Sequence, residues 1–196
     1  MIMDAQQAST KVTLENVRVG YVHVFETSRI GDGQPKYSVA VLLPKSDTAN
    51  IARIQEAMNV AMEQGKQKKW GGRIPAILEL PPKDGDVKDL VKNPEYAGCY
   101  IINCGNTTKP MVVSRSRQPI TDPADFYSGC YANVIVNLFP WHNVGKSGIS
   151  ASLLGCQFVG DGERLAASVA SVDDFAALEA APAPAFGAQA PAFGQQ

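Results

Sequence analysis

The chain has 196 residues, of which 45% are hydrophobic and 19% charged, a composition typical of a soluble globular protein with one domain and a proper core. No stretch approaches the roughly 18 to 20 apolar residues of a membrane-spanning helix, and the N-terminal MIMDAQQASTK lacks the apolar core of a signal peptide. We therefore expect a cytosolic protein with no membrane partner.

Charge is unevenly distributed along the chain. The net charge is −1, but residues 161–196 hold one basic residue and five acidic ones, which gives this segment a charge of −4. The first 160 residues hold 17 basic and 14 acidic residues, a charge of +3. The sequence therefore predicts a mildly basic body followed by an acidic tail, an asymmetry that the net charge conceals.

A long antiparallel hairpin is predicted near the N-terminus. Residues 1–10 are expected to be disordered, whereas Val12 to Phe25 is rich in β-branched and aromatic residues and is predicted to be a strand. If side chains alternate strictly along this strand, one face carries Val17, Val19, Tyr21 and His23. The opposite face then carries Arg18, Val22 and Val24. Turn residues over 29–35 separate it from a second strand, Tyr37 to Leu43, which is expected to stop at Pro44.

One helix is predicted over residues 47–64. Ser46 is a plausible N-cap, Asp47 suits the first turn, and Gly65 is a plausible stop. The apolar stripe consists of Ile51, Ile54, Met58, Ala61 and Met62. The segment KQKKWGGR, residues 66–73, follows directly, so its lysines suit a helix C-terminus. Its tryptophan is expected either to fold back into the core or to contact a polyanion that carries flat rings.

The rest of the body is predicted to be mainly β. Residues 75–97, rich in proline and Asp-Gly, are expected to be an irregular connection, and residues 122–129 a turn. Four more strands are predicted: Tyr100–Cys104, Met111–Ser114, Cys130–Phe139 and Ile149–Val159. Beyond Gly160 the chain turns to Ala, Pro, Gly and Gln and repeats Ala-Pro-Ala-Phe-Gly, so 161–196 is predicted to be disordered. Six strands with one helix indicate a small antiparallel barrel.

Motifs for common enzyme chemistry are missing from the sequence. There is no GxxxxGK[ST] loop, GxGxxG, HExxH or GxSxG. Cys99 and Cys104 are five apart, which is not the spacing of a zinc or redox pair, so the four cysteines are expected to be buried reduced thiols. Asp84, Asp86 and Asp89 are interpreted as an acidic loop, with a metal site as the alternative. We expect no enzyme activity, cofactor or metal.

Two long segments without any acidic residue are the strongest functional signal. Residues 96–121 and 126–160 contain no Asp or Glu, but they carry Lys109, Arg115 and Arg117 together with several aromatic residues. Single-stranded nucleic acid is bound by this mixture, because cations follow the phosphates and rings stack on unpaired bases. Aromatic residues in strands more often belong to a core, so any single ring is a weak candidate.

Several segments together resemble a family of tailed-bacteriophage single-stranded-DNA-binding proteins that was long known only as a domain of unknown function. They are YSVAVLLPKSD (37–47), KKWGGRIP (68–75), DGD (84–86), TKPMVV (108–113), QPITDPADFYSGCYANVIVNLF (118–139) and DDF (173–175). The resemblance covers about residues 12–160 plus Asp173, Asp174 and Phe175. The family is itself distantly similar to the helix-destabilising proteins of short-tailed phages.

The resemblance implies a fold and a set of partners. The implied fold is an oligonucleotide/oligosaccharide-binding fold (OB-fold), a five-stranded Greek-key barrel with one main helix and extra loops, over residues 11–160. The implied function is coating of single-stranded DNA in phage replication, recombination and repair, in the cytoplasm of the infected host, with weaker binding to duplex. The acidic tail, with Asp173, Asp174 and Phe175, is expected to recruit replication proteins and to compete with DNA. This chain departs from the pattern because it continues for 21 residues beyond Phe175. Self-association as a dimer or filament is left open.

Charge, ring chemistry and the resemblance together define the candidate DNA-binding residues. They are Tyr37, Lys66, Lys68, Lys69, Trp70, Arg73, Tyr100, Lys109, Arg115, Arg117, Phe126, Tyr127 and Tyr131. Two other classes compete with this interpretation. A metal-dependent nuclease would use Asp84, Asp86 and Asp122, and a structural barrel of the virion would bind no nucleic acid.

Overall fold

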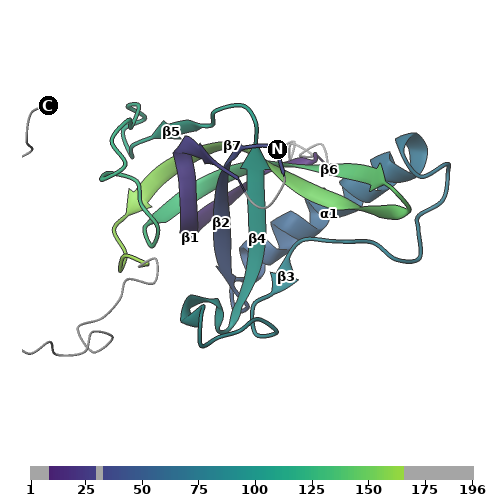
Figure 1. Ribbon diagram of the computed structural model, residues 1–196, viewed down its shortest axis with the longest axis horizontal. Coiled ribbons are helices and arrows are strands. Elements are labelled where there is room, and N and C mark those ends of the chain that lie inside the picture. The colour runs from purple at the N-terminus through teal and green to yellow at the C-terminus, as the bar shows by residue number, and fades with distance from the viewer. Residues whose placement is uncertain (1–8, 30–32, 166–196) are drawn as a thin grey trace, which may run out of the picture. The chain divides into compact units, whose positions relative to one another are not determined.

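The structure, a computed structural model, describes residues 9–29 and 33–165. Five strands close into a barrel in the order β1-β2-β4-β7-β6 and back to β1, with one short parallel contact between β4 and β7 and antiparallel pairing elsewhere (Figure 1). These strands are β1 (Lys11–Ser28), β2 (Lys36–Pro44), β4 (Cys99–Asn106), β6 (Tyr131–Asn143) and β7 (Lys146–Gly160). The prediction of a mainly β, OB-like barrel with one helix is confirmed.

Two short strands extend the sheet beyond the barrel. β3 (Lys83–Asp84) pairs with the outside of β4, and β5 (Met111–Val113) runs parallel to β7. The connection predicted to be irregular thus contains β3, an isolated β-bridge from Glu79 to Gly148 of β7, and a 3-10 turn, Pro94–Tyr96, with turns and coil between them. No helix in the described part of the chain is long and apolar enough to cross a membrane.

β1 curves around the barrel because it contains two bulges. Asn16 and Tyr21 both have φ near +50°, and the pairing of β1 with its neighbours shifts at each of them. Val17 and Val19 are both buried and so share a face as predicted, but the shift at Tyr21 leaves His23 exposed and turns Val24 into the core. The prediction of strict alternation through His23 is therefore wrong, since each bulge exchanges the two faces of the strand.

The helix α1 (Thr48–Lys68) packs against β6 and β1. Its N-cap is Asp47, whose carboxylate accepts from the backbone N–H of Asn50, so the cap lies one residue later than predicted. The buried stripe includes Ile54 and Ala61, with Ile51, Met58 and Met62 half-buried beside it. Asn50 is buried too, and its amide exchanges two hydrogen bonds with the backbone of Glu15 next to the first bulge of β1.

The helix does not stop at Gly65, which corrects the sequence-based boundary. Gly65 is buried inside the helix, and α1 continues to Lys68. Helical bonding ends at Gly71 and Gly72, which have φ of +62° and +83°, and the N–H of Gly72 bonds back to the carbonyl of Lys66. The two glycines therefore terminate the helix, because a left-handed backbone at this position suits residues without a side chain.

The first residues of the predicted tail lie against the barrel. Arg18 donates to the carbonyl of Glu163 at 2.9 Å, and the N–H of Leu165 donates to the carbonyl of Ser128 at 2.9 Å. The predicted disorder of residues 1–8 and 166–196, and the tail residues Asp173, Asp174 and Phe175, lie outside the described residues.

Candidate nucleic-acid interface

The outward side of β1, β2 and β4, which we call the outer face, forms the front of the molecule in Figure 1. Alternation along β2 sends Val39, Val41 and Leu43 into the core. The alternate residues therefore point outward, and on the paired strand β4 they are matched by Ile101, Asn103 and Gly105. In OB-folds the outer side of the second and third barrel strands binds oligonucleotides, and these strands are β2 and β4 here.

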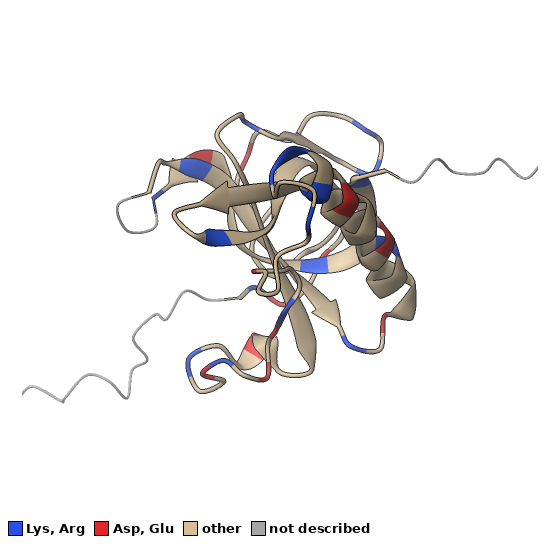
Figure 2. Ribbon diagram, turned by 90° about the vertical axis from the view of Figure 1, so that its right-hand side faces the viewer, with Lys and Arg blue, Asp and Glu red and all other residues tan. Residues whose placement is uncertain are grey.

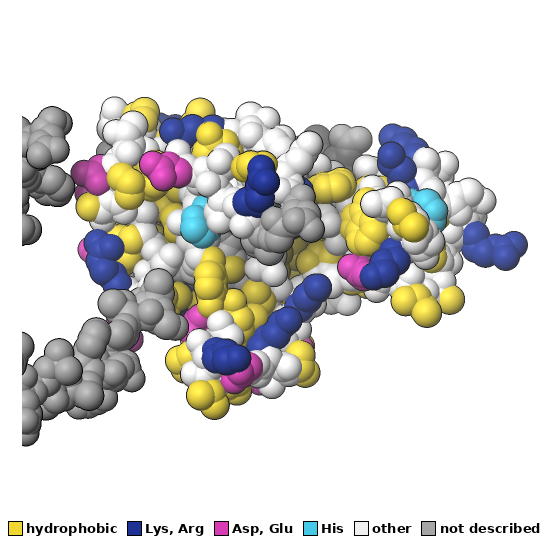
Figure 3. Space-filling model, in the orientation of Figure 1, with side chains coloured by type: hydrophobic (Ala, Val, Ile, Leu, Met, Phe, Trp, Pro, Cys, Tyr) yellow, Lys and Arg dark blue, Asp and Glu magenta, His cyan; other side chains and the backbone are white. Residues whose placement is uncertain are grey.

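The floor of the outer face is apolar. Ala40, Leu42 and Ile101 form a separate cluster outside the barrel core, with Tyr96 and Leu165 packed on it. Figure 3 shows hydrophobic side chains in a hollow at the centre of this face, with Lys and Arg side chains around it. Ala40, Leu42 and Ile101 are themselves buried, so a ligand on this face would meet the rings and cations around them.

A pair of tyrosines stands at one side of this floor. The rings of Tyr21 and Tyr96 lie 6.1 Å apart at 49°, and Tyr21 is 46% exposed. The Tyr21 hydroxyl donates to the side chain of Asn93 at 2.7 Å, which fixes the ring on the outer face. Burial, followed by the hydrogen bond to Tyr96, raises the pKa of Tyr21 well above its usual value. Tyr21 therefore stays neutral, and its partly exposed ring is held in place on the outer face.

Two lysines that sequence reasoning did not single out lie on the outer face. The Lys36 side chain lies over Gly105, since a Cβ built at Gly105 would come within 3.8 Å of its Cδ. Lys83, on β3, is paired with Ile101 of β4. Neither ammonium group has an acidic partner within the described residues, so both charges are available to a phosphate.

A basic cluster stands at the end of α1. It consists of Lys66, Lys68, Lys69 and Arg73, which we call the helix-end cluster. Figure 2 shows these cations grouped at the end of the helix and in the turn that follows, whereas acidic residues lie along its body. Only Lys66 has an acidic neighbour among the described residues, Glu63 at 3.7 Å.

Trp70 holds this cluster on the barrel. Its ring lies against Gly65, where an added Cβ would come within 2.6 Å of the indole, and its N–H donates to the carbonyl of Trp141 on β6 at 3.1 Å. The ring also packs against the core and is half-buried. Of the two roles considered for Trp70, the structure favours the internal one, since the indole N–H and part of its surface are already occupied.

The remaining predicted cations lie elsewhere. Lys109, Arg115 and Arg117, the β5 cluster, are exposed and flank β5. The amide of Gln157 on β7 donates to the carbonyls of Ser114 and Arg115, while Gly148 at the other end of β7 faces Trp141. Nine residues of strand separate these two points, or roughly 30 Å. The structure therefore does not bring the two basic clusters together.

The structure corrects the choice of Phe126 as a candidate DNA-binding residue. Its side chain is only 1% exposed and belongs to the main core, so it cannot stack on a base. It was a candidate because it is an aromatic residue in the acid-free segment 126–160, but the turn folds this ring inward. Tyr131 is 38% exposed at the start of β6 and stays available.

The other predicted rings are half-buried and partly engaged. The Tyr127 hydroxyl donates to Asp161 at 2.7 Å, and this bond raises the pKa of the phenol. The guanidinium of Arg164 covers the same ring at 3.8 Å. Tyr100 packs against the core with the Lys45 ammonium 5.3 Å from its ring, whereas Tyr37 lies at the end of β2 opposite Asn106.

Comparison with known proteins identifies the family. The sequence matches, over residues 10–184, the family described as Enterobacter phage Enc34, ssDNA-binding protein. The chain belongs to this family of phage ssDNA-binding proteins. The chain is also similar to a protein p50 of Acyrthosiphon pisum secondary endosymbiont phage 1, which is 34% identical over 177 residues, 84% of this chain and 92% of that protein.

Solved structures of the Enc34-type family agree with the fold. The single-stranded DNA-binding protein from bacteriophage Enc34 in complex with ssDNA is 29% identical, with a TM-score of 0.69 over 80% of this chain and 90% of that one. Gp2.5, a single-stranded DNA-binding protein encoded by bacteriophage T7, has a TM-score of 0.56 at 15% identity, over 84% of this chain and 91% of that one, which shows a shared fold.

The acidic loop, the basis of the nuclease hypothesis, is an internal clasp in this Enc34-type chain. Lys45 bonds to Asp84 and to Asp86, each at 2.7 Å, and these bonds hold the pKa of both carboxyls below the usual range. Asp122 belongs to another turn, where it accepts from the N–H of Ala124. Within residues 9–29 and 33–165, no group of three or more acidic, His or Cys side chains is arranged to hold a metal ion.

The cysteines are free thiols. Cys104, Cys130 and Cys156 are buried and Cys99 is half-buried, which confirms the expected burial for three of the four. Burial raises the pKa of the Cys156 thiol to about 12 and that of Cys104 and Cys130 above the ordinary value. These thiols stay protonated near neutral pH and are chemically inert.

Proposed function

We propose that this chain is a sequence-independent single-stranded-DNA-binding protein that coats and protects ssDNA, and that it is not an enzyme. The observation that carries the proposal is the outer face, where the exposed Tyr21 and the half-buried Tyr96 lie with lysines that have no acidic partner among the described residues. In an Enc34-type protein this face is also the side of the barrel that OB-folds use for oligonucleotides. Its chemistry needs no particular base.

Each part of the face has a separate task in this proposal. Lys36 and Lys83 neutralise phosphates and release their counterions, which makes binding strongly dependent on salt. Tyr21 and Tyr96 supply surfaces on which bases stack, at about 1–3 kcal/mol per base. The helix-end cluster extends the positive path beyond the barrel, and Tyr131 and the β5 cluster serve longer strands on the far side.

Membership of a phage ssDNA-binding family supports a proposal for the biological setting. We infer that the protein acts on ssDNA formed during phage replication, recombination and repair in the cytoplasm of the infected host. Duplex DNA binds more weakly, because paired bases offer no exposed rings for stacking. Replication proteins bind through the tail, at Asp173, Asp174 and Phe175.

A second role of the tail is competition with DNA. Leu165, the last described residue, packs on Leu42 and over Gly20 on the outer face. The segment 161–196 carries −4 against +3 for the rest of the chain, and such charges attract over about 10 Å at 0.1 M salt. Removing residues 166–196, while keeping Leu165, should tighten binding at low salt. Unchanged affinity would reject competition by the tail.

The proposed function is tested with the full chain and a labelled oligo-dT. Fluorescence anisotropy should show binding at low salt, a steep loss of affinity as salt rises, and weaker binding to a duplex of the same length. Incubation with magnesium or manganese should leave the strand intact. Lack of any binding to oligo-dT at low salt, or metal-dependent cleavage that Asp84→Ala abolishes, would overturn the proposal.

A further inference from the structure

A pocket of about 160 Å³ opens beside the outer face, where β4 and β7 diverge. These strands pair only at Cys104 and Ala151, and residues 79–83 bridge the gap between them. Glu79 exchanges backbone hydrogen bonds with Ser147 and Ile149 of β7 at one end of the bridge, and Lys83 pairs with Ile101 of β4 at the other. The pocket is therefore framed by main-chain bonds on both sides.

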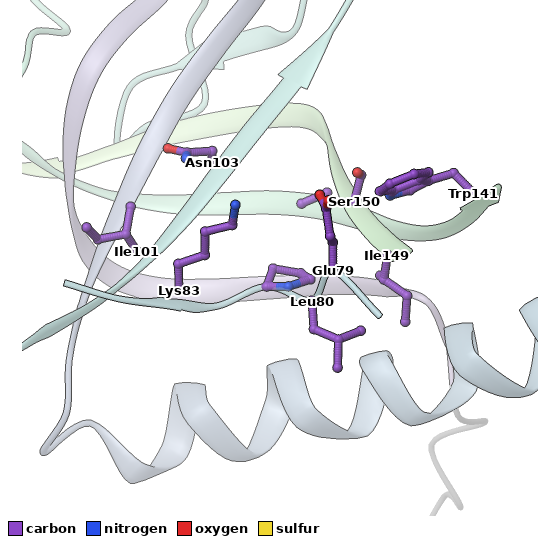
Figure 4. A pocket seen from close by; sticks show the side chains of 10 residues that line it. Glu79, Leu80, Lys83, Ile101, Asn103, Trp141, Ile149 and Ser150 are labelled. Carbon is purple, nitrogen blue, oxygen red and sulfur yellow. The ribbon is translucent and has the colours of Figure 1, made fainter. Parts of the chain in front are cut away.

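The walls of the pocket combine apolar surface with polar side chains that have no partner among the described residues. Figure 4 shows the Trp141 indole extending toward Ser150 at one end, and the Lys83 side chain rising toward Asn103 at the other. No hydrogen bond within the described part of the chain involves the Asn103 amide, the Ser150 hydroxyl or the Lys83 ammonium group. The Trp141 N–H is buried and likewise has no acceptor there.

These groups mark the pocket as a ligand site rather than a packing gap. The Trp141 N–H is sealed from solvent and therefore from a ligand in the pocket, so the accessible polar groups of the wall are Lys83, Asn103 and Ser150. Ile101 and Ile149 supply apolar contact for a ring, while Lys83, Asn103 and Ser150 supply donors and acceptors at its edge. A flat heterocycle with carbonyl and N–H groups on its rim, tethered to a phosphate, fits this set.

The volume selects among such heterocycles. A protein cavity of about 150 Å³ accommodates a single benzene ring. A pyrimidine base is one six-membered ring with small substituents, whereas a purine carries a second fused ring. We propose that this pocket takes one pyrimidine base out of a bound single strand, with Lys83 beside its phosphate. The inference rests on the proposed function, and it adds a preference for dT and dC over dA at one position.

The test uses Trp141 as its own reporter. The chain has two tryptophans, so Trp70→Phe leaves only the indole that lines the pocket. In this background oligo-dT and oligo-dC should quench tryptophan emission, whereas saturating oligo-dA should quench it clearly less. An oligo-dT with one 5-iodouracil should photocrosslink to the peptide that contains Trp141. Equal quenching by the three strands, or crosslinks only to other peptides, would overturn the inference.

Pocket variants separate this preference from the stiffness of oligo-dA itself. Wild type should bind oligo-dT about five-fold or more tightly than oligo-dA, as one stacked base requires. The ratio should fall toward one in Asn103→Leu, whose side chain is exposed, and in Ser150→Val. A ratio that neither variant changes would contradict the pocket, because the strands are the same in every measurement.

A matched pair of lysines completes the design. Lys83→Ala should lower dT affinity and reduce the quenching of Trp141, whereas Lys88→Ala, in the same connection but outside the pocket, should leave both unchanged. Equal effects of the two variants would show that Lys83 contributes only a non-specific positive charge. That result would contradict its place beside the bound base. If wild type binds neither oligo-dT nor oligo-dA, the proposed function itself fails, which is a different result from equal binding of both.

Discussion

Trp70 donates its indole N–H to the backbone carbonyl of Trp141 across 3.1 Å, which ties the end of α1 to β6 next to the pocket. Trp70 therefore anchors the basic segment to the barrel instead of presenting its ring to a ligand. The cations are left on the surface, and the two glycines that follow end the helix. This arrangement explains why the largest apolar side chain of the segment stands among lysines.

Gly65→Ala should destabilise the protein, although the same change normally stabilises a helix by about 0.5–1 kcal/mol. The added Cβ would lie 2.6 Å from the Trp70 ring and 2.8 Å from Pro140, and overpacking of this kind costs about 1–3 kcal/mol. Urea unfolding measures the difference, with Gln67→Ala on the exposed side of the helix as control. A Gly65→Ala protein more stable than wild type would mean that Trp70 does not occupy this position.

The two basic clusters should respond differently to the length of the DNA. Replacing Lys68, Lys69 and Arg73 by Ala should weaken binding of oligo-dT of about eight and about twenty nucleotides alike, because this cluster adjoins the pocket. Replacing Lys109, Arg115 and Arg117 should weaken only the longer strand, since the β5 cluster lies roughly 30 Å away along β7. Anisotropy titrations distinguish the two, and equal effects at both lengths would argue for one continuous site.

The Lys45 clasp should make part of the stability depend on pH. The pKa values of Asp84 and Asp86 are lowered in the folded state, so their contribution is complete above the unfolded value of about 4 and is lost as pH falls through the lowered values. Lys45→Met should therefore lower Tm at pH 7 and have less effect near pH 3. Lys92→Met, which removes an exposed pair with Asp89, is the control. An effect of Lys45→Met that is equal at both pH values would contradict the clasp.

Thiol labelling should separate one cysteine from the other three. At pH 8 Ellman's reagent should react first with Cys99, which is half-buried, and only slowly with the buried Cys104, Cys130 and Cys156. Cys99→Ser should abolish the early phase, and urea should release the remaining thiols together. Rapid labelling of two or more thiols in the folded protein would show that the core opens more readily than its packing indicates.

Sequence patterns predicted the fold well where one face of an element is apolar. β2, β4, β6 and β7 lie where strand-like runs predicted them, and the stripe of α1 packs on the core. The bulges of β1 were missed because Asn16 and Tyr21 adopt a positive φ without a glycine to mark them. The end of α1 was missed because a buried helical glycine and a terminal one look alike until Trp70 is seen to lie against it.

The candidate site was harder to predict than the fold. Composition located the helix-end cluster. It could not show that Phe126 lies in the core, or that Lys36 and Lys83 lie on the outer face. Ala40 and Leu42 are apolar on the outward side of β2, so hydrophobicity does not distinguish its two faces. The one sequence signal for Lys83 was its place beside the DGD turn, and this signal becomes useful only when β3 is seen to pair with β4.

The most direct test of the account is the salt dependence of oligo-dT binding by Lys36→Ala/Lys83→Ala, compared with Lys88→Ala/Lys92→Ala. Each phosphate contact on single-stranded DNA contributes about 0.7 to the slope of log affinity against log salt. The outer-face variant should therefore bind more weakly, with a slope reduced by about 1.4, while the control keeps the wild-type slope. Identical slopes for wild type and both variants would show that DNA does not cross the outer face of β2 and β4.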